Sequence, residues 1–252
     1  MKQFSVDLLS VRVYDSRREM GEAAAADIRA CILKLLTTHQ QINMIFAAAP
    51  SQNEVLAALA ADDTIPWNRI HAYHMDEYIG LPADASQGFG NFMRRHLFDL
   101  VPFASVNCIC STAPDPQAEC DRYAKLLADH PAHIVVMGIG ENGHIAFNDP
   151  PVADFRDPQA VKIVALDPIC RNQQVNDGCF AHLDLVPTHA ITLTVPTLSA
   201  APNLFCIVPA PTKAQAVRET LRGSIDEHCP ATILRKCAGS VLYLDPDSAA
   251  LL

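Results

Sequence analysis

The segment Ala132-His133-Ile134-Val135-Val136-Met137-Gly138 decides the fold class of this chain. Its centre is apolar without interruption, which is typical of a strand buried on both faces, as in a parallel sheet covered by helices. The glycine-rich sequence IGENGHIAFNDP follows directly, at residues 139–150. A polar turn after a buried strand is the usual position of a ligand site in an open α/β sheet.

The same alternation of apolar strands and amphipathic helices extends over the rest of the chain. Further strands are predicted at 42–49, 69–75, 106–109, 161–165, 190–195, 203–208 and 240–244, and helices at 17–36, 52–61, 89–100, 116–128 and 212–222. No repeat, Gly/Ser-rich linker or charge block divides the sequence. We therefore predict a single α/β domain over residues 1–252, with a mainly parallel, open, Rossmann-like sheet and helices on both faces.

Composition narrows the classes of function. The 19 basic and 28 acidic residues give a net charge of −9, which disfavours a nucleic-acid or anionic-membrane surface. No apolar run reaches the length of about 20 residues that spans a bilayer, and the N-terminus does not resemble a secretory signal. The nine cysteines are odd in number and contain no CxxC pair, which favours reduced core thiols in a cytoplasmic protein.

Two predicted strand ends could hold an anion. The sequence APSQ at 49–52 lies between a strand and a helix, whose N-terminus offers free backbone N–H groups. Ser51 could cap that helix or donate its hydroxyl to a ligand, and the segment alone does not decide between these roles. Lys213 also lies at a helix start, where its charge opposes the helix dipole. An anionic ligand would explain that lysine, and a solvated side chain is the alternative.

Two adjacent carboxylates, Asp76 and Glu77, follow the strand predicted at 69–75. Neighbouring residues on an extended segment point in opposite directions, so one of the two can face a ligand while the other pairs elsewhere. A carboxylate in a closed cleft can have a raised pKa and act as a base. A solvated acidic turn is the alternative interpretation.

The glycine-rich turn contains a candidate base. His144 follows Gly138, Gly140 and Gly143, and Asp149 stands five residues later, where it could orient the imidazole. A structural histidine is the alternative. The glycines match the spacing GxGxxG, but no convincing helix or ribose-binding acid follows them, so dinucleotide binding is disfavoured.

Taken together, these segments resemble the glucosamine-6-phosphate deaminase (isomerase) family, whose fold is shared with 6-phosphogluconolactonases. The sequence HMDEYIGLP at 74–82 is similar to the family's MDEYVGLP segment, and NGHIAFNDP at 142–150 is similar to its [DN]GHIAFN[ED]P segment. The lactonase branch tends to read GHTASLFP instead, and this chain does not. The resemblance extends from about residue 17 to residue 245.

The resemblance implies a 2-amino-2-deoxyhexose 6-phosphate as substrate and neither a metal nor an organic cofactor. His144 would move a proton at the ring oxygen, with Asn142 and Asp149 holding its imidazole. Asp76 would carry a proton between C2 and C1, after which water at C2 expels ammonia. The implied substrate-binding and phosphate-binding residues are Ala49, Ser51, Gln52, Glu77, Gly140, Gly143, Arg171 and Lys213.

The chain departs from the family pattern at several of these positions. The sequence Ala-Pro-Ser at 49–51 replaces the family's Gly-Gly-Thr/Ser turn, and Pro50 removes one backbone donor. Asn142 and Asp149 stand where the family often has Asp and Glu. Arg171 lies about five residues before the expected phosphate arginine. These changes leave open a variant sugar phosphate as substrate.

Three other functions stay open at this point: lactone hydrolysis, isomerisation of a galactosamine-type phosphate, and a non-catalytic sugar-phosphate sensor. Asp76 in its MDEY context favours transfer of a proton between aldose and ketose. A sensor is expected to have lost Asp76 or His144, and both are present. The family includes monomers and hexamers, so a homo-oligomer is one option.

Overall fold

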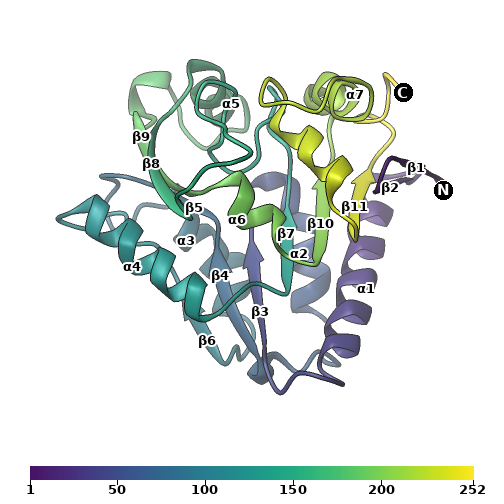
Figure 1. The fold of residues 1–252 in the computed structure, drawn as a ribbon, viewed down its shortest axis with the longest axis horizontal. Coiled ribbons are helices and arrows are strands. Elements are labelled where there is room, and N and C mark those ends of the chain that lie inside the picture. Colours follow the sequence, from purple (N-terminus) through teal and green to yellow (C-terminus); the bar gives the residue numbers. More distant parts are fainter.

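The computed structural model describes all 252 residues and contains one large sheet of eight strands (Figure 1). The strand order is β1-β2-β11-β10-β7-β3-β4-β6, and every neighbouring pair is parallel except the hairpin of β1 and β2. This confirms the predicted parallel sheet. The strands are β1 (Lys2–Val6), β2 (Leu9–Val13), β3 (Ile42–Phe46), β4 (Ile70–His74), β6 (Ser105–Asn107), β7 (Ile134–Met137), β10 (Asn203–Val208) and β11 (Ser240–Leu244).

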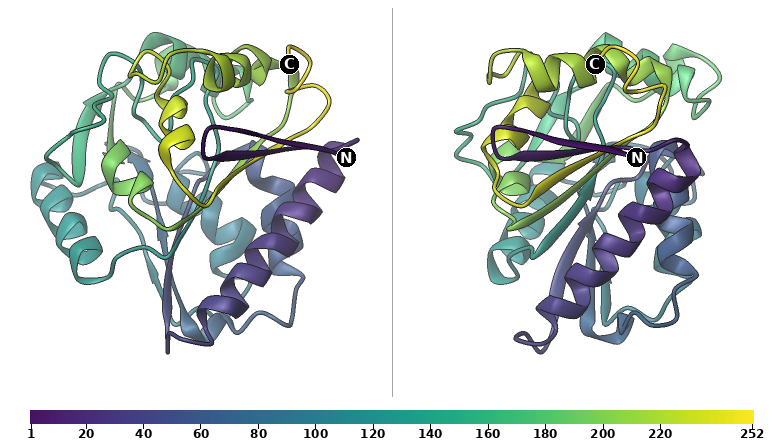
Figure 2. Two further views of the ribbon diagram at one scale, coloured as in Figure 1. Left: turned by 45° about the vertical axis from the view of Figure 1, so that its right-hand side comes forward. Right: turned by 90° about the vertical axis from the view of Figure 1, so that its right-hand side faces the viewer.

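Helices cover both faces of this sheet, and Figure 2 shows α1 on the face opposite the C-terminal segment. Successive residues of a buried strand feed two different cores: Phe46 packs with the α1, α2 and α3 side, whereas Ile45 packs with the α4, α6 and α7 side. None of the helices has the length and apolarity needed to cross a membrane. The helices are α1 (Arg17–Leu35), α2 (Asn53–Ala60), α3 (Phe89–Met93), α4 (Pro116–Asp129), α5 (Pro168–Asn176), α6 (Val195–Ser199) and α7 (Ala214–Arg222).

Short helical turns complete the fold. A π-helix at Arg94–Phe98 continues α3, and 3-10 turns lie at Pro50–Gln52, Trp67–Arg69, Leu183–Leu185, Pro211–Lys213 and Pro230–Lys236. All nine cysteines are unpaired, as the sequence led us to expect. Only Cys110 is exposed.

A second, antiparallel sheet is formed by β5 (Asp76–Tyr78), β9 (His189–Leu193) and β8 (Val161–Ala165). The strands predicted at 161–165 and 190–195 therefore exist, but they lie outside the parallel sheet. Asp76 is paired with Thr192 across this small sheet. The pairing fixes the backbone of Asp76 at the point where the chain leaves β4.

Several elements were not predicted, among them the N-terminal hairpin, β5, α5 and α6. Its outer strand, β1, is the edge of the sheet and is mostly exposed, and β2 fully buries only Leu9 and Val11, so neither strand has the apolar run that identified the others. Helix α5 has a readable start signal, because Asp167 caps it by accepting the N–H of Ile169 and Pro168 occupies its first turn.

The strand order places the loops after β3, β7 and β10 at one edge of the sheet. The chain moves outward from β3 to β4 and β6, and in the other direction from β7 to β10 and β11, so the order reverses between β3 and β7. The two strand ends are adjacent, since the N–H of Ala47 donates to Val136 O at 2.9 Å. Ligand sites of open α/β sheets lie at such a reversal.

His74, at the end of β4, makes the stability of the fold depend on pH. It is fully buried, and its Nε2 accepts the N–H of Ile109 at 2.9 Å. Burial lowers its pKa from 6.5 to about 4. The free energy of unfolding is therefore unaffected above pH 6.5 and falls by about 3 kcal/mol as the pH drops to 4. We expect His74→Gln, which can still accept that N–H, to flatten this fall in urea unfolding. Parallel pH curves for both proteins would contradict the prediction.

Candidate active site

A cavity lies at the reversal of strand order. Its walls come from the loop after β3, which includes Ala49 and Ser51, and from Gly138 to Gly140 after β7. Lys213 enters from the turn after β10. Helix α5 and Asp177 close the cavity on the side away from the sheet. Asp76 and His144 both face this space.

Asp76 presents a nearly enclosed carboxylate to the cavity. Asp76 is 5% exposed, and Phe89 and Phe147 line the same cavity. Burial, and secondarily the neighbouring charge of Glu77, raise the pKa of Asp76 well above its ordinary value. A carboxylate in this environment is a stronger base than one in water, as removal of a proton from carbon requires.

Glu77 points the other way, as expected for adjacent residues on a strand. Its carboxylate accepts the N–H groups of Tyr78, Phe89 and Gly90 at 2.9, 3.0 and 2.8 Å, so it caps the start of α3. Burial raises the pKa of Glu77, although these three hydrogen bonds oppose the rise. Glu77 does not line the cavity, so its expected contact with substrate is replaced by a structural role.

His144 is held by two side chains from its own turn. Its Nδ1 lies 2.7 Å from Asn142 Oδ1 and 2.9 Å from Asp149 Oδ1, and Asn142 Nδ2 donates to the same carboxylate oxygen at 2.9 Å. Because both neighbours of Nδ1 are acceptors, Nδ1 carries the hydrogen, and Nε2 of the neutral ring is free to take a proton. Burial raises the pKa of Asp149, but hydrogen bonds, first that of His144, bring it below its ordinary value.

Gly140 leaves room for this imidazole. A Cβ at residue 140 would lie 2.1 Å from Cε1 of His144, and the N–H of Gly140 also donates to His144 O. We expect Gly140→Ala to displace the ring and lower kcat about 100-fold. Gly80→Ala is the control: its φ of +87° strains the backbone by about 1 kcal/mol, but no atom lies within 4 Å of the added Cβ. Equal kcat values for the two variants in a steady-state assay would contradict the prediction.

The far end of the cavity is suited to an anion. Lys213 is 5% exposed and forms no ion pair within the chain. Burial lowers its pKa, while the charges of Asp177 and Glu141 oppose this. Ser51, which carries a hydroxyl group, lines the same cavity. An enclosed ammonium without a partner favours a ligand that carries negative charge.

Arg17, from the first turn of α1, is a second cation that the sequence did not reveal. Its Nη2 donates to Pro50 O at 2.6 Å, and its Nε lies 2.8 Å from Glu54 Oε1. It lines the cavity beside Ser51. No local signal marks it, because its place depends on how α1 packs against α2, far along the chain.

Besides Glu77, three residues expected to bind substrate lie outside the cavity. Gln52 is fully buried and donates to Ser51 Oγ and to Ile207 O, so it supports the wall from behind. Gly143 has a φ of +84° and lies where a Cβ would be 2.5 Å from Cys229 Sγ, so it shapes the turn. Arg171 donates to Leu183 O and Val186 O, both at 2.8 Å, and secures the loop after α5. The structure therefore does not bring Arg171 to the cavity where an anion would bind.

Helix α5 contributes polar groups that were not anticipated. Gln173 Oε1 accepts the N–H of Glu141 at 2.9 Å, which ties the helix to the glycine-rich turn. Gln174 and Asp177 also line the cavity. The Asp-Pro start of α5 is the signal that could have indicated a helix here.

The groups around His144 are not arranged for a metal ion. His144, Asp149 and Cys170 offer ligand atoms within 4.8 Å of one another. The imidazole and the carboxylate, however, are hydrogen-bonded to each other.

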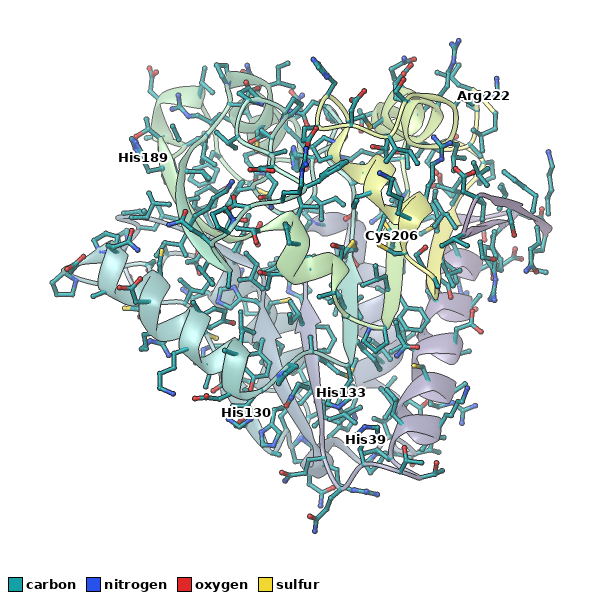
Figure 3. The ribbon with its side chains drawn as sticks, viewed as in Figure 1. His39, His130, His133, His189, Cys206 and Arg222 are labelled. Carbon is teal, nitrogen blue, oxygen red and sulfur yellow. The ribbon has the colours of Figure 1, made fainter.

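Of the ten histidines in the chain, His144 alone lines the cavity. His39, His130 and His133 gather at the opposite end of the sheet, near the starts of β3 and β7 (Figure 3). The rings of His39 and His133 are in edge contact, with centroids 4.8 Å apart. These histidines are too far along the strands to take part in chemistry at the cavity.

Comparison with known proteins identifies a matching family and similar sequences. Residues 15–243 match the model of the family described as glucosamine-6-phosphate isomerases/6-phosphogluconolactonase. A glucosamine-6-phosphate deaminase of Listeria monocytogenes serotype 4a is 32% identical over 85% of this chain and 90% of its own. Another glucosamine-6-phosphate deaminase, of Exiguobacterium sibiricum, is 34% identical over 75% of this chain and 73% of its own.

Two solved structures show how widely the fold is shared. One, described as a monomeric glucosamine-6-phosphate deaminase, has a TM-score of 0.87 and 25% identity, covering 96% of this chain and 99% of its own. The 6-phosphogluconolactonase of Trypanosoma brucei has a TM-score of 0.80 and 19% identity, covering 98% and 100%. At that identity the second likeness indicates the fold alone.

Proposed function

Because the chain belongs to the family of glucosamine-6-phosphate isomerases and 6-phosphogluconolactonases, we propose that it converts glucosamine 6-phosphate and water into fructose 6-phosphate and ammonia. One observation carries this proposal: an enclosed, raised-pKa carboxylate, Asp76, and an oriented imidazole, His144, face the same cavity. The reaction needs a base for carbon and a separate group for the ring oxygen, and these two residues can divide that work.

Ring opening is assigned to His144. Nε2 of the neutral imidazole takes the proton of the C1 hydroxyl and returns it to the ring oxygen as the C1–O bond breaks, which gives the open-chain aldehyde. The imidazolium formed in between is stabilised by Asp149, whose carboxylate accepts from Nδ1. Asn142 supplies a second acceptor at Nδ1 and so prevents the ring from rotating.

Isomerisation is assigned to Asp76. Its carboxylate removes the proton from C2 of the aldehyde as the C1–C2 double bond forms, and the aldehyde oxygen takes a proton from the substrate's own ammonium group, which gives an enolamine. The protonated Asp76 then delivers the proton to C1, and the ketimine results. Water adds to C2, and the C–N bond breaks to release ammonia and leave the ketone. Such a base needs accurate positioning, which the pairing of Asp76 with Thr192 provides.

The phosphate is assigned to the far end of the cavity. Lys213 supplies the enclosed positive charge, and Ser51, which lines the same cavity, supplies a hydroxyl donor. Arg17 adds a guanidinium, although Glu54 already shares its charge. A phosphorylated intracellular metabolite agrees with nine unpaired thiols, so we place the protein in the reducing cytoplasm.

Replacing Lys213 by methionine is expected to weaken binding of the phosphorylated substrate. Loss of one charge-assisted hydrogen bond should raise KM about 10- to 100-fold and change kcat much less. The control is Lys125→Met, because Lys125 is exposed on α4 and pairs only with Asp129. The measurement is KM from initial rates with glucosamine 6-phosphate. An unchanged KM for Lys213→Met would contradict the assignment.

Lactone hydrolysis is the second candidate function. The fold shared with 6-phosphogluconolactonases favours it, and His144 could activate a water for it. Lactone hydrolysis, however, does not require removal of a proton from carbon, so the enclosed carboxylate of Asp76 would have no role in it. A galactosamine-type phosphate differs from the proposed substrate only at C4, and the same residues could process it.

A parallel assay decides among these functions. The purified protein is supplied with glucosamine 6-phosphate, galactosamine 6-phosphate and 6-phosphogluconolactone, and release of ammonia and of acid is recorded. We expect ammonia from glucosamine 6-phosphate at the highest kcat/KM. Acid release from the lactone without ammonia from either amino sugar would establish the lactonase function instead. Faster release from galactosamine 6-phosphate would change the substrate and keep the reaction type.

A further inference from the structure

Cys170 lies beside the proposed proton-transfer groups, and the mechanism above gives it no role. It is in the first turn of α5 and is 1% exposed. Its sulfur, an imidazole nitrogen of His144 and a carboxylate oxygen of Asp149 all lie within 4.8 Å of one another. The thiol therefore lies next to the carboxylate that holds the imidazole.

The two oxygens of Asp149 are unequally satisfied. Oδ1 receives hydrogen bonds from His144 and Asn142, whereas Oδ2 is enclosed and receives no hydrogen bond from any nitrogen, oxygen or sulfur donor in the observed geometry. Asp149 is 0% exposed, so water does not reach the residue from the surface. A buried carboxylate oxygen without a donor is costly. The donor that remains beside it is the S–H group of Cys170.

The charge states of the two groups suit such a bond. Burial raises the pKa of Cys170 well above its ordinary value, and the nearby charges of Asp149, Asp76 and Asp167 raise it further. Its hydrogen is therefore retained at neutral pH. Although burial raises the pKa of Asp149, the hydrogen bond and charge of His144 and the hydrogen bond of Asn142 lower it overall, so Asp149 is a carboxylate. A thiol that keeps its hydrogen faces a carboxylate that can accept it.

We propose that Cys170 is a positioning residue, whose S–H donates to Oδ2 of Asp149 and fixes the rotation of the carboxylate that holds His144. The proposal rests on the proposed function. It also links the helix over the cavity to the imidazole, because Cys170 and Gln173 lie on the same helix and Gln173 accepts the N–H of Glu141. The cover of the cavity and the group that opens the sugar ring are then held as one unit.

Kinetics of three variants test the role. Cys170→Ala removes the donor, Cys170→Ser keeps one of similar size, and Cys120→Ala removes an equally buried thiol on α4. We expect Cys170→Ala to lower kcat about tenfold, with KM nearly unchanged, and to shift the limb of the pH profile that reports His144. Cys170→Ser should recover most of the loss, and Cys120→Ala should match the unchanged protein.

The outcomes that overturn the proposal are equally defined. If Cys170→Ala keeps the kcat and pH profile of Cys120→Ala, the thiol does not position Asp149. If Cys170→Ser is as impaired as Cys170→Ala, the thiol acts by packing and the proposed hydrogen bond is refuted.

A nitrogen-15 NMR titration of His144 in the unliganded protein tests the proposal without turnover. Loss of the thiol donor leaves more of the carboxylate charge for the imidazolium, so the pKa of His144 should rise in Cys170→Ala and return in Cys170→Ser. Identical titrations in all three proteins would overturn the proposal. Absence of ammonia release from every amino-sugar phosphate would instead defeat the proposed function, and the titration would still decide the role of Cys170.

Discussion

Replacing Asp76 by asparagine is expected to lower kcat for ammonia release about 10³-fold while KM changes little. The amide keeps the shape of the carboxylate but cannot accept a proton from carbon. The pKa of Asp76 is raised by burial, so the unchanged enzyme should lose activity as the pH falls through this raised pKa, above the ordinary range of an aspartate. The measurement is kcat and KM from initial rates between pH 4 and 9, by a coupled ammonia assay.

Glu77→Gln is the matched control for Asp76→Asn. Both changes remove one negative charge, and the two residues are adjacent, but Glu77 faces the start of α3. We expect Glu77→Gln to lower the free energy of unfolding by about 1–3 kcal/mol and to leave kcat within about tenfold of the unchanged enzyme. If Asp76→Asn retains full activity, or if the two variants lose activity equally, Asp76 is not the base.

Replacing His144 by glutamine is expected to lower kcat about 10²-fold on the cyclic substrate. Glutamine cannot relay a proton between the C1 hydroxyl and the ring oxygen, so the enzyme would depend on spontaneous ring opening. A 5-deoxy analogue, which cannot close the six-membered ring, should be much less affected. His189→Gln is the control, because His189 is exposed on β9 and does not line the cavity. Equal losses on the cyclic substrate and the analogue would contradict ring opening as the role of His144.

The parallel sheet was predictable because burial on both faces leaves a continuous apolar run. Residues 44–46, 134–137 and 204–208 show such runs, and each lies in a strand of the sheet. The second sheet was not predictable, because β5 pairs with β9 and these segments are far apart in the sequence. Such pairing depends on tertiary packing, on which local pattern carries no information.

The residues of the candidate site likewise include some that the sequence could place and others that depend on tertiary packing. Asp76, His144 and Lys213 follow strands, and the reversal of strand order brings strand ends together, so the sequence could place them at one cavity. Arg17 could not be found in this way, since it begins a helix and reaches the cavity only through packing of α1 on α2. Arg171 illustrates the opposite difficulty. Its position about five residues before the expected phosphate arginine suggested an anion contact, whereas its guanidinium donates to backbone carbonyls of the loop that follows α5.

The most direct test of the proposed chemistry follows the transferred proton. The purified protein is incubated in H₂O with glucosamine 6-phosphate that carries deuterium at C2, ammonia is quantified, and the sugar product is examined by proton and deuterium NMR. We predict equimolar ammonia and fructose 6-phosphate, with deuterium at C1 in one of the two prochiral positions, and no ammonia from Asp76→Asn on the same time scale. Ammonia release without deuterium at C1 in repeated trials, together with an active Asp76→Asn, or hydrolysis of 6-phosphogluconolactone in place of deamination, would contradict it.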